Sequence, residues 1–487
     1  MKQTRILLLF LASLASLAAL SPAGTQPADP SPSSYDLTFE TAWRLIRDTH
    51  FDPTYNGVDW DAVHEEFAPL AEHAGSQDEI RAIISDMLTR LGESHFALIP
   101  SEVADVLPGE DAAADVAPDE APHPDAVVHE ESPAKGAQAP DPEEEVLENE
   151  SYGGGDAWLG LDVRPLDGRL LITRVEPGSP ADQAGIRPGW VITYIGKRDV
   201  ARRIDSFAHL DLKSASTEIV AWQILTELLS GELGSLARLS VLDADGNSRR
   251  LTLKRVPRPG EMAKFGNLPP LNSRLEWSWL DPEKYDIPSD VRVGYIRFNI
   301  FMMPASREFE RAVYELRDAD GLVIDIRGNL GGIGALAMGM GGRLVDKTAS
   351  LGTMQMRGAS LKFNLYPQYA TSWGQPTHPF TGRLAIITDA ISASTSEVFA
   401  GGLQAIGRAE VFGERTAGMA LPAAMDRLPN GDVLLHAIAD FHTSKGERLE
   451  KTGVIPDVPV PTTREDLLAG IDAPLARAAH WAATGEE

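Results

Sequence analysis

The 487-residue chain contains no cysteine. This absence excludes a disulfide framework, a thiolate metal site and a cysteine nucleophile, and it is neutral about whether the compartment is oxidising. Covalent catalysis would have to use Ser, Thr, Lys or a carboxylate. Basic residues are also scarce, because 44 Lys and Arg stand against 71 Asp and Glu, for a net charge of −27. A charge of this sign repels phosphate backbones, so nucleic acid is not an expected partner.

Long apolar runs are scarce as well, and the one that stands out lies at the start of the chain. It spans residues 6–20, follows Lys2 and Arg5, and ends in the small residues of Ser21-Pro22-Ala23. Such an arrangement is typical of a cleaved export signal, whereas a membrane span is usually longer. We therefore expect a signal peptide over residues 1–23 and a periplasmic or extracellular protein without stable membrane insertion; an uncleaved anchor is the alternative.

The hydrophobic pattern divides the rest of the chain into domains. Apolar residues at helical spacing predict a helical N-terminal domain over residues 35–100. Residues 101–154 are rich in acidic residues, Ala and Pro, which predicts an acidic disordered linker. Short β-type runs predict a β domain over residues 155–257. Alternating strand and helix patterns predict an α/β core with a largely parallel sheet over residues 285–465, followed by a C-terminal helix or tail over residues 466–487.

Two motifs that would indicate a cofactor or a metal are incomplete. The glycine-rich stretch at residues 332–337 resembles a dinucleotide fingerprint, but residues 348–387 contain no Asp or Glu to hold a ribose. His64 and Glu65 begin a zincin-like motif, but Ala68 stands where the second histidine belongs. We therefore expect neither a cofactor nor a metal.

A serine-rich turn between a predicted strand and a predicted helix is the strongest candidate for chemistry. It contains Ser394, whose hydroxyl would lie above the sheet, next to the N–H groups of the helix N-terminus. Ser394 and Glu397 also have the spacing of a capping box, in which the two side chains only satisfy helix amides. On spacing alone the capping box is the simpler interpretation.

Several motifs, taken together, favour a catalytic role for Ser394 over a capping role. They are SASTSEVFAGGLQAIGRAEVFGERTAG at residues 392–418, LVIDIRGNLGG at 322–332, GVIPDV at 453–458, and PGSPA with AGIRPGW at 177–190. The set resembles the carboxy-terminal processing, or tail-specific, family of serine peptidases over roughly residues 37–100 and 158–460. The resemblance implies an α+β or α/β multidomain protein with a PDZ-like β domain and an α/β core of the tail-specific protease (ClpP/crotonase-like) type.

The resemblance also implies a catalytic serine. Ser394 aligns with the nucleophile of the family, with one oxyanion amide from Gly331 or Gly332 and another from Thr395. The lysine base of the family is missing, because Met419 stands at the aligned position. A thioether cannot accept a proton, so either the protein is inactive or another residue deprotonates Ser394.

The tricorn-like branch of the same family supplies an alternative base. Its histidine follows a serine at the end of the first helical unit, and a glutamate shortly before the GV.PD strand orients the site. Ser94, His95 and Glu450 stand at the corresponding places. This resemblance predicts His95 as the base for Ser394, oriented by Ser94 and Glu450.

The expected function is that of an exported serine-type peptidase acting on polypeptides, with an acyl-enzyme at Ser394. The PDZ-like domain would present substrate, through C-termini bound at the Leu159-Gly160-Leu161 loop. The alternative is an inactive family member that binds peptides or apolar ligands, with Met419, Leu421 and Met425 forming an apolar wall.

Overall fold

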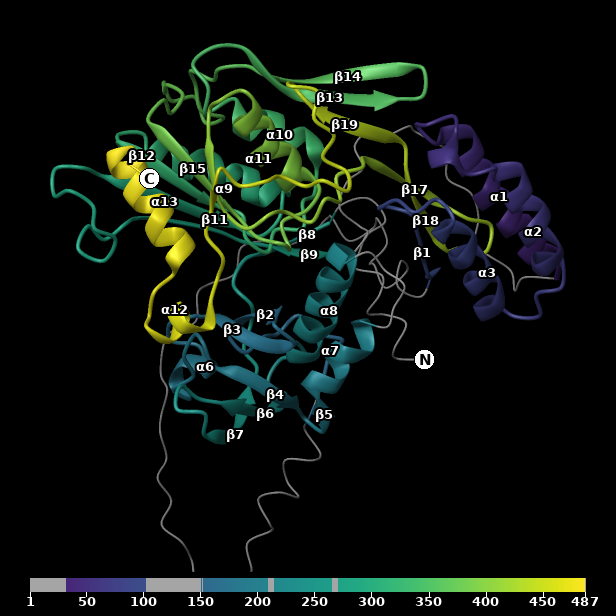
Figure 1. Ribbon diagram of the computed structural model, residues 1–487, viewed down its shortest axis with the longest axis horizontal. Helices are drawn as coiled ribbons and strands as arrows, with labels where there is room; N and C mark the ends of the chain where they lie inside the picture. Colours follow the sequence, from purple (N-terminus) through teal and green to yellow (C-terminus); the bar gives the residue numbers. More distant parts are fainter. Residues whose placement is uncertain (1–31, 102–149, 151, 209–213, 265–269, 487) are drawn as a thin grey trace, which may run out of the picture.

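The computed structural model describes residues 32–101, 150, 152–208, 214–264 and 270–486. The predicted signal peptide and most of the predicted acidic linker lie outside the described residues. Within these ranges, no helix is both long and apolar enough to cross a membrane. The described chain forms a mixed α/β molecule with a helical unit, a middle domain and a core (Figure 1).

The core is built on a six-stranded sheet in the order β10-β11-β12-β15-β16-β20. The bounds of its strands are β10 Leu275–Trp279, β11 Val293–Phe298, β12 Gly321–Asp325, β15 Arg383–Thr388, β16 Glu410–Gly413 and β20 Val458–Pro459. All neighbours are parallel except the edge strand β10, which runs antiparallel to β11. The prediction of a largely parallel sheet is confirmed.

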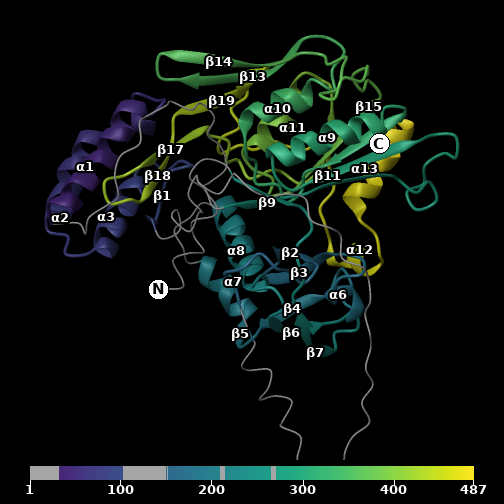
Figure 2. The ribbon, with the colours of Figure 1, turned by 180° about the vertical axis from the view of Figure 1, so that it is seen from behind.

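Helices cover both faces of this sheet, as its apolar strands require. Along β12, Leu322 and Ile324 face one hydrophobic cluster and Val323 faces another. Figures 1 and 2 show the helices of these two faces. The first face packs against α9 (Met303–Glu315), α10 (Gly334–Gly341) and α11 (Thr395–Ala405), and the second against α13 (Ala473–Thr484).

Two small sheets join the core to its surroundings. One is β1-β18-β17, in which β1, at the end of the helical unit, pairs with β18 of the core, and β18 pairs with β17. The other is β14-β13-β19. Their bounds are β1 Ala97–Ile99, β17 Ala423–Arg427, β18 Val433–Ala437, β13 Ala349–Met356, β14 Ala359–Leu365 and β19 Ala439–Thr443; a further pair joins β8 (Glu261–Ala263) to β9 (Leu271–Ser273).

The helical unit consists of α1 (Pro32–Thr49), α2 (Trp60–Glu72) and α3 (Gln77–Thr89). Asp59 caps α2 and Ser76 caps α3, each by accepting a hydrogen bond from an amide of the first turn. Its buried cluster continues into Leu98 and Leu434 of the β1-β18-β17 sheet and into Leu428, which directly follows β17. The unit therefore packs onto the core through this sheet, next to the loop that holds His95.

The middle domain contains a six-stranded antiparallel sheet and three helices. The bounds are β2 Leu161–Leu166, β3 Arg169–Val175, α6 Pro180–Gln183, β4 Val191–Ile195, β5 Arg198–Asp199, α7 Val200–Ala208, α8 Ser214–Leu229, β6 Leu236–Leu242 and β7 Ser248–Lys254. Its domain boundary differs from the predicted one. Glu150 forms a bridge to Leu236 and the Gly153 amide donates to the Ser230 carbonyl, so the last residues of the range 101–154 belong to this domain.

The middle domain lies against the carboxyl ends of the core strands (Figure 2). Its apolar cluster includes Ile391, Ala393, Ala417 and Met419 of the core. The short helix α12 (Arg464–Leu468) also reaches it, because Arg464 donates to the Gly189 carbonyl. The two parts thus share one hydrophobic cluster at the edge of the sheet where an α/β protein places its functional groups.

Candidate active site

Ser394 lies at the junction between β15 and α11, directly before Thr395. Its backbone has φ +62° and ψ −119°, unlike the extended conformation of an ordinary helix cap. Positive φ strains a residue other than glycine, and such strain concentrates at functional sites. The residue is fully buried, with 0% exposure. The structure also contains the capping box of Ser394 and Glu397, so the serine caps α11 from a strained strand-to-helix turn.

The predicted oxyanion residues lie beside this turn. A β-carbon on Gly331, which has φ +98°, would stand 2.7 Å from Ser394 Cβ and 2.8 Å from the Thr395 amide nitrogen. The Thr395 hydroxyl donates to the Gly332 carbonyl at 2.8 Å. The Gly331 amide donates to Asn329 Oδ1 at 2.9 Å, so this amide is engaged within the protein in the described conformation.

Glu397, in the first turn of α11, also belongs to the site, although its spacing from Ser394 indicated only a capping partner. Its Oε2 accepts hydrogen bonds from the amides of Ser394 and Met419, both at 2.9 Å. Its Oε1 accepts from Thr416 Oγ1 at 2.6 Å and from the Gly418 amide at 2.7 Å. Burial raises the pKa of Glu397 to about 7, although these hydrogen bonds act to lower it.

The structure brings Ser94, His95 and Glu450 together, although Ser94 and Glu450 are 356 residues apart in sequence. Ser94 Oγ lies 2.7 Å from His95 Nδ1 and donates to Glu450 Oε2 at 2.9 Å. The Ser94 amide donates to Glu450 Oε1 at 3.0 Å. When Glu450 is ionised, the single hydroxyl proton of Ser94 goes to this carboxylate, and Nδ1 of His95 then donates to Ser94 Oγ. A neutral His95 therefore carries its lone pair on Nε2, as a general base requires.

Met419, which the family resemblance aligns with the lysine base, contributes its backbone amide to the hydrogen bonds of Glu397. The Ala420 amide donates to Glu450 Oε2 at 2.9 Å. Three consecutive amides, Gly418 to Ala420, thus bond to two buried carboxylates, Glu397 and Glu450. Burial also raises the pKa of Glu450.

A further ion pair ties the two loops of this arrangement together. Arg448 Nη2 donates to Glu93 Oε1 at 3.0 Å, and His50 Nε2 lies 3.5 Å from Glu93 Oε2. Glu93 precedes Ser94, and Arg448 lies two residues before Glu450. No sequence motif pointed to Glu93 or His50, because their partners come from distant parts of the chain.

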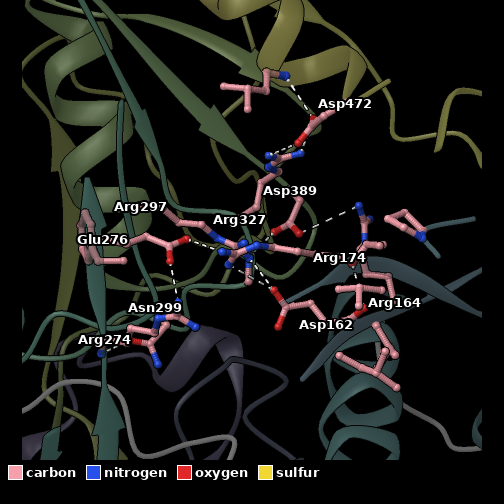
Figure 3. Close-up of a pocket in the computed structure, with 18 of the residues that line it drawn as sticks. Asp162, Arg164, Arg174, Arg274, Glu276, Arg297, Asn299, Arg327, Asp389 and Asp472 are labelled. Atoms are coloured by element: carbon pink, nitrogen blue, oxygen red, sulfur yellow. Dashed lines mark hydrogen bonds and ion pairs between the residues drawn. The ribbon is translucent and has the colours of Figure 1, made fainter. Parts of the chain in front are cut away.

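A cavity of about 640 Å³ separates the middle domain from the carboxyl ends of the core strands, and charged side chains from both sides meet in it (Figure 3). The interdomain ion pairs are Asp162–Arg297 at 3.0 Å, Glu176–Arg274 at 2.7 Å, Arg174–Glu276 at 2.7 Å and Arg164–Glu414 at 2.7 Å. Arg164 also lies 3.9 Å from Asp389. Asp389 accepts hydrogen bonds from the Ile391 and Ser392 amides, so it shapes the turn that leads to Ser394.

The predicted peptide loop Leu159-Gly160-Leu161 lies at the start of β2, and Gly160 has φ +82°. A β-carbon at Gly160 would clash with Ser179, which explains the glycine. Next to this loop, Trp222 of α8 donates from its indole Nε1 to the Val163 carbonyl of β2 at 2.9 Å. The loop is present, but Trp222 uses a strand-edge acceptor that an added peptide strand would need.

The described ranges contain no group of three or more His, Cys, Asp or Glu placed to hold a metal ion. Ser394 is linked instead to Glu397 through its amide, and the adjacent amides of Met419 and Ala420 connect Glu397 to Glu450, which holds Ser94 next to His95. Such a set is suited to acyl transfer by general base catalysis.

Comparisons with known proteins point the same way. Residues 292–460 match peptidase family S41, and residues 34–89 match the tricorn protease C1 domain. The chain is 24% identical over 441 residues to the chloroplastic carboxyl-terminal-processing peptidase 3 of Arabidopsis thaliana, covering 88% of this chain and 70% of the relative. It is 25% identical over 426 residues to the carboxyl-terminal-processing protease of a Picosynechococcus species, covering 86% of this chain and 82% of the relative.

Solved structures share the fold. The photosystem II D1 C-terminal processing protease superimposes with a TM-score of 0.52 at 20% identity, covering 91% of this chain and 98% of that protein. Mature CPAF complexed with lactacystin superimposes with a TM-score of 0.53 at 12% identity, covering 90% of this chain and 95% of that protein.

Proposed function

Because this chain is a serine-type peptidase with a core of peptidase family S41, we propose that it cleaves polypeptides through an acyl-enzyme at Ser394, with His95 as the base. The observation that carries the proposal is the hydrogen-bonded chain from His95 Nδ1 through Ser94 Oγ to Glu450. It provides an oriented imidazole in a protein whose family lysine is replaced by Met419.

The proposed reaction has two stages, acylation of the serine and hydrolysis of the acyl-enzyme. Ser394 Oγ attacks the scissile carbonyl carbon while its proton passes to His95 Nε2, and the carbonyl oxygen becomes an oxyanion. When the C–N bond breaks, the imidazolium returns the proton to the leaving amine and the acyl group stays on Ser394. Water then attacks the ester while His95 accepts a proton from it; as the ester C–O bond breaks, the imidazolium returns this proton to Ser394 Oγ and the carboxylic acid product leaves, ionising to the carboxylate.

The oxyanion would be stabilised by amides beside the turn. Thr395 at the start of α11 is one candidate, because its amide lies at a helix N-terminus. Gly332 is the better second candidate, because the Gly331 amide donates to Asn329 in the described conformation.

The middle domain is proposed to be PDZ-like and to control access to Ser394. Ser394 is fully buried, and the cluster that includes Ala393 and Met419 is shared with the middle domain. A polypeptide can therefore reach the serine only after this domain shifts, and the interdomain ion pairs resist that shift. In the same movement Trp222 must release the Val163 carbonyl before a substrate C-terminus can bind by strand addition.

Export belongs to the proposal as well. It rests on the signal-like sequence of residues 1–23. Relatives named as chloroplastic or bacterial processing proteases are compatible with it. Comparing the N-terminus of the secreted protein with that of the cytoplasmic precursor by mass spectrometry tests it; identical N-termini in both fractions would contradict cleavage.

The experiment that tests the catalytic assignment is labelling with a fluorophosphonate, followed by peptide mapping. The proposal predicts phosphonylation of Ser394 in the wild type, none in Ser394→Ala, and very slow labelling in His95→Ala. If the wild-type protein is never labelled and never cleaves a denatured polypeptide mixture, the catalytic proposal fails and the alternative of a non-catalytic binding protein takes its place.

A further inference from the structure

Glu397 makes more contacts than a helix cap needs. The hydrogen bond from the Ser394 amide is the return half of a capping box. The other three donors, Thr416, Gly418 and Met419, lie 19, 21 and 22 residues further along the chain. A capping function accounts for the first contact and for none of the others.

These contacts join the turn of the nucleophile to the segment that holds the base. Glu397 binds the amides of Gly418 and Met419, and Glu450 binds the next amide, Ala420. Glu450 is also the acceptor for Ser94, which orients His95. A displacement of residues 418–420 would therefore move the base relay relative to the serine.

The network continues into the GVIPDV motif. Thr416 Oγ1 donates to Glu397 and accepts from the Val454 amide at 2.6 Å. A β-carbon at Gly453 would stand 2.6 Å from the Thr416 carbonyl oxygen, so the two segments pack in direct contact. The GVIPDV motif is thus linked to the Glu397 carboxylate through the Thr416 hydroxyl.

We propose that Glu397 is a positioning residue for the hydrolytic reaction, and that its ionised carboxylate aligns Ser394 with the relay of Glu450, Ser94 and His95. The inference rests on the proposed role of Ser394. Both carboxylate oxygens accept two hydrogen bonds, so a neutral side chain at this position cannot accept all four. Protonated Glu397, or a glutamine in its place, presents a hydrogen to a donor and loosens the segment 418–420.

The pH dependence of acylation separates this role from a purely structural one. In the wild type, two groups must lose a proton before Ser394 reacts, namely His95 and Glu397, whose pKa burial raises to about 7. The logarithm of the phosphonylation rate should therefore rise with pH with a limiting slope of two below pH 6. In Glu397→Gln the slope should fall to one, and the plateau rate should fall by a factor on the order of 10², as a displaced catalytic geometry does.

The matched control is Glu310→Gln. Glu310 is also a buried helical carboxylate, paired with Arg343 and with the Ser372 amide, but it lies on α9 and contacts none of these segments. This variant should keep the slope of two and the wild-type plateau, even if its stability falls.

A second variant keeps the proposal testable if Glu397→Gln does not fold. Thr416→Val removes one hydrogen bond that lowers the pKa of Glu397, so its acid limb should move to higher pH. An unchanged acid limb in Thr416→Val, or a two-proton slope and full rate in Glu397→Gln, overturns the inference. Absence of any labelling of wild-type Ser394 overturns the proposed function instead, so the two failures are distinguishable.

Discussion

Two groups of carboxylates, one buried and one partly exposed, lie at the carboxyl edge of the core sheet, and they are stabilised in different ways. Around the serine, Glu397 and Glu450 accept hydrogen bonds from amides and hydroxyls, and burial raises the pKa of both. Across the interdomain cavity, Asp162 and Glu414 face arginines. Burial acts to raise their pKa values, but the arginines Arg297 and Arg164 lower them overall.

Because of this difference, the two regions should respond to different solution conditions, one to pH and the other to salt concentration. A carboxylate surrounded by neutral donors gains or loses its proton near neutrality, so the serine site should respond to pH. An arginine–carboxylate pair stays charged over that range and is weakened by salt where solvent reaches it. We therefore expect the reactivity of Ser394 to depend on pH, and the contact between the middle domain and the core to depend on ionic strength.

The largest expected effect comes from the serine and its base. Ser394→Ala and His95→Ala should each lower kcat by a factor on the order of 10³ or more, because nucleophile and base act as one unit. For the same reason the double variant should be little worse than either single one. Steady-state cleavage of a denatured protein checks this, with circular dichroism to show an unchanged fold. Full activity in His95→Ala would place the base elsewhere.

Glu450→Gln should lower kcat by a factor on the order of 10² or more, because it should favour the wrong tautomer of His95. The new amide group can donate to Ser94 Oγ, which then donates its own proton to His95 Nδ1 and leaves Nε2 protonated. Glu447→Gln, an exposed carboxylate in the same loop, is the matched control and should be silent. If both variants hydrolyse peptides like the wild type, the relay does not orient the base.

The charge of Glu397 should also be visible in stability. An elevation of its pKa from 4.5 to about 7 means that the folded protein keeps a proton that the unfolded chain has lost between these pH values. The free energy of unfolding therefore falls as pH rises through this window, by about 3 kcal/mol at most. Glu397→Gln lacks this effect, so its urea unfolding curves should change less between pH 5 and 8. Parallel changes in both proteins would contradict the assignment.

The smallest expected effect concerns the interdomain ion pairs. Their side chains are partly exposed, with 21% for Glu176 and 22% for Arg274, so each pair is worth little and is screened by salt. Arg274→Gln, or a rise in NaCl from 0.05 to 0.5 M, should speed labelling of Ser394 about two- to fivefold, because the middle domain shifts more readily. Arg307→Gln breaks an exposed ion pair with Glu261 that is not among the interdomain pairs and should leave the rate unchanged. Labelling that slows with salt would contradict a closing role.

The sequence predicted the elements that depend on local pattern. The parallel strands and the helices of the core follow from buried apolar runs and caps, and the family motifs pointed to Ser94, His95 and Glu450, which the structure places in one hydrogen-bonded chain. Their catalytic roles remain predictions. The contacts of Glu397 were not predictable, because two of its remote donors are backbone amides, which carry no residue signature.

The charged network across the cavity could not be predicted from the sequence, for another reason. Its charged residues are spread along the chain between Asp162 and Asp472. In the sequence, each of them therefore looks like an ordinary surface residue. The extent of the linker was also overestimated, because acidic composition continues up to Glu150 while that residue already pairs with the middle domain. Composition indicates the average tendency of a segment to be disordered, whereas the pairing of a single residue such as Glu150 depends on which residue lies next to it in the folded protein.

The most direct test of the account is the pH dependence of Ser394 phosphonylation in the wild type and in His95→Ala. An imidazole base predicts a rate that rises through roughly pH 6 to 7.5 and then levels off, because an unperturbed imidazole titrates near about 6.5. His95→Ala should remove nearly all of the rate, and the small rate that remains should rise with the one-proton slope of Glu397 instead of the two-proton slope of the wild type. A rate that keeps rising through pH 8 to 10, or one that persists in His95→Ala, would contradict the claim that His95 activates Ser394.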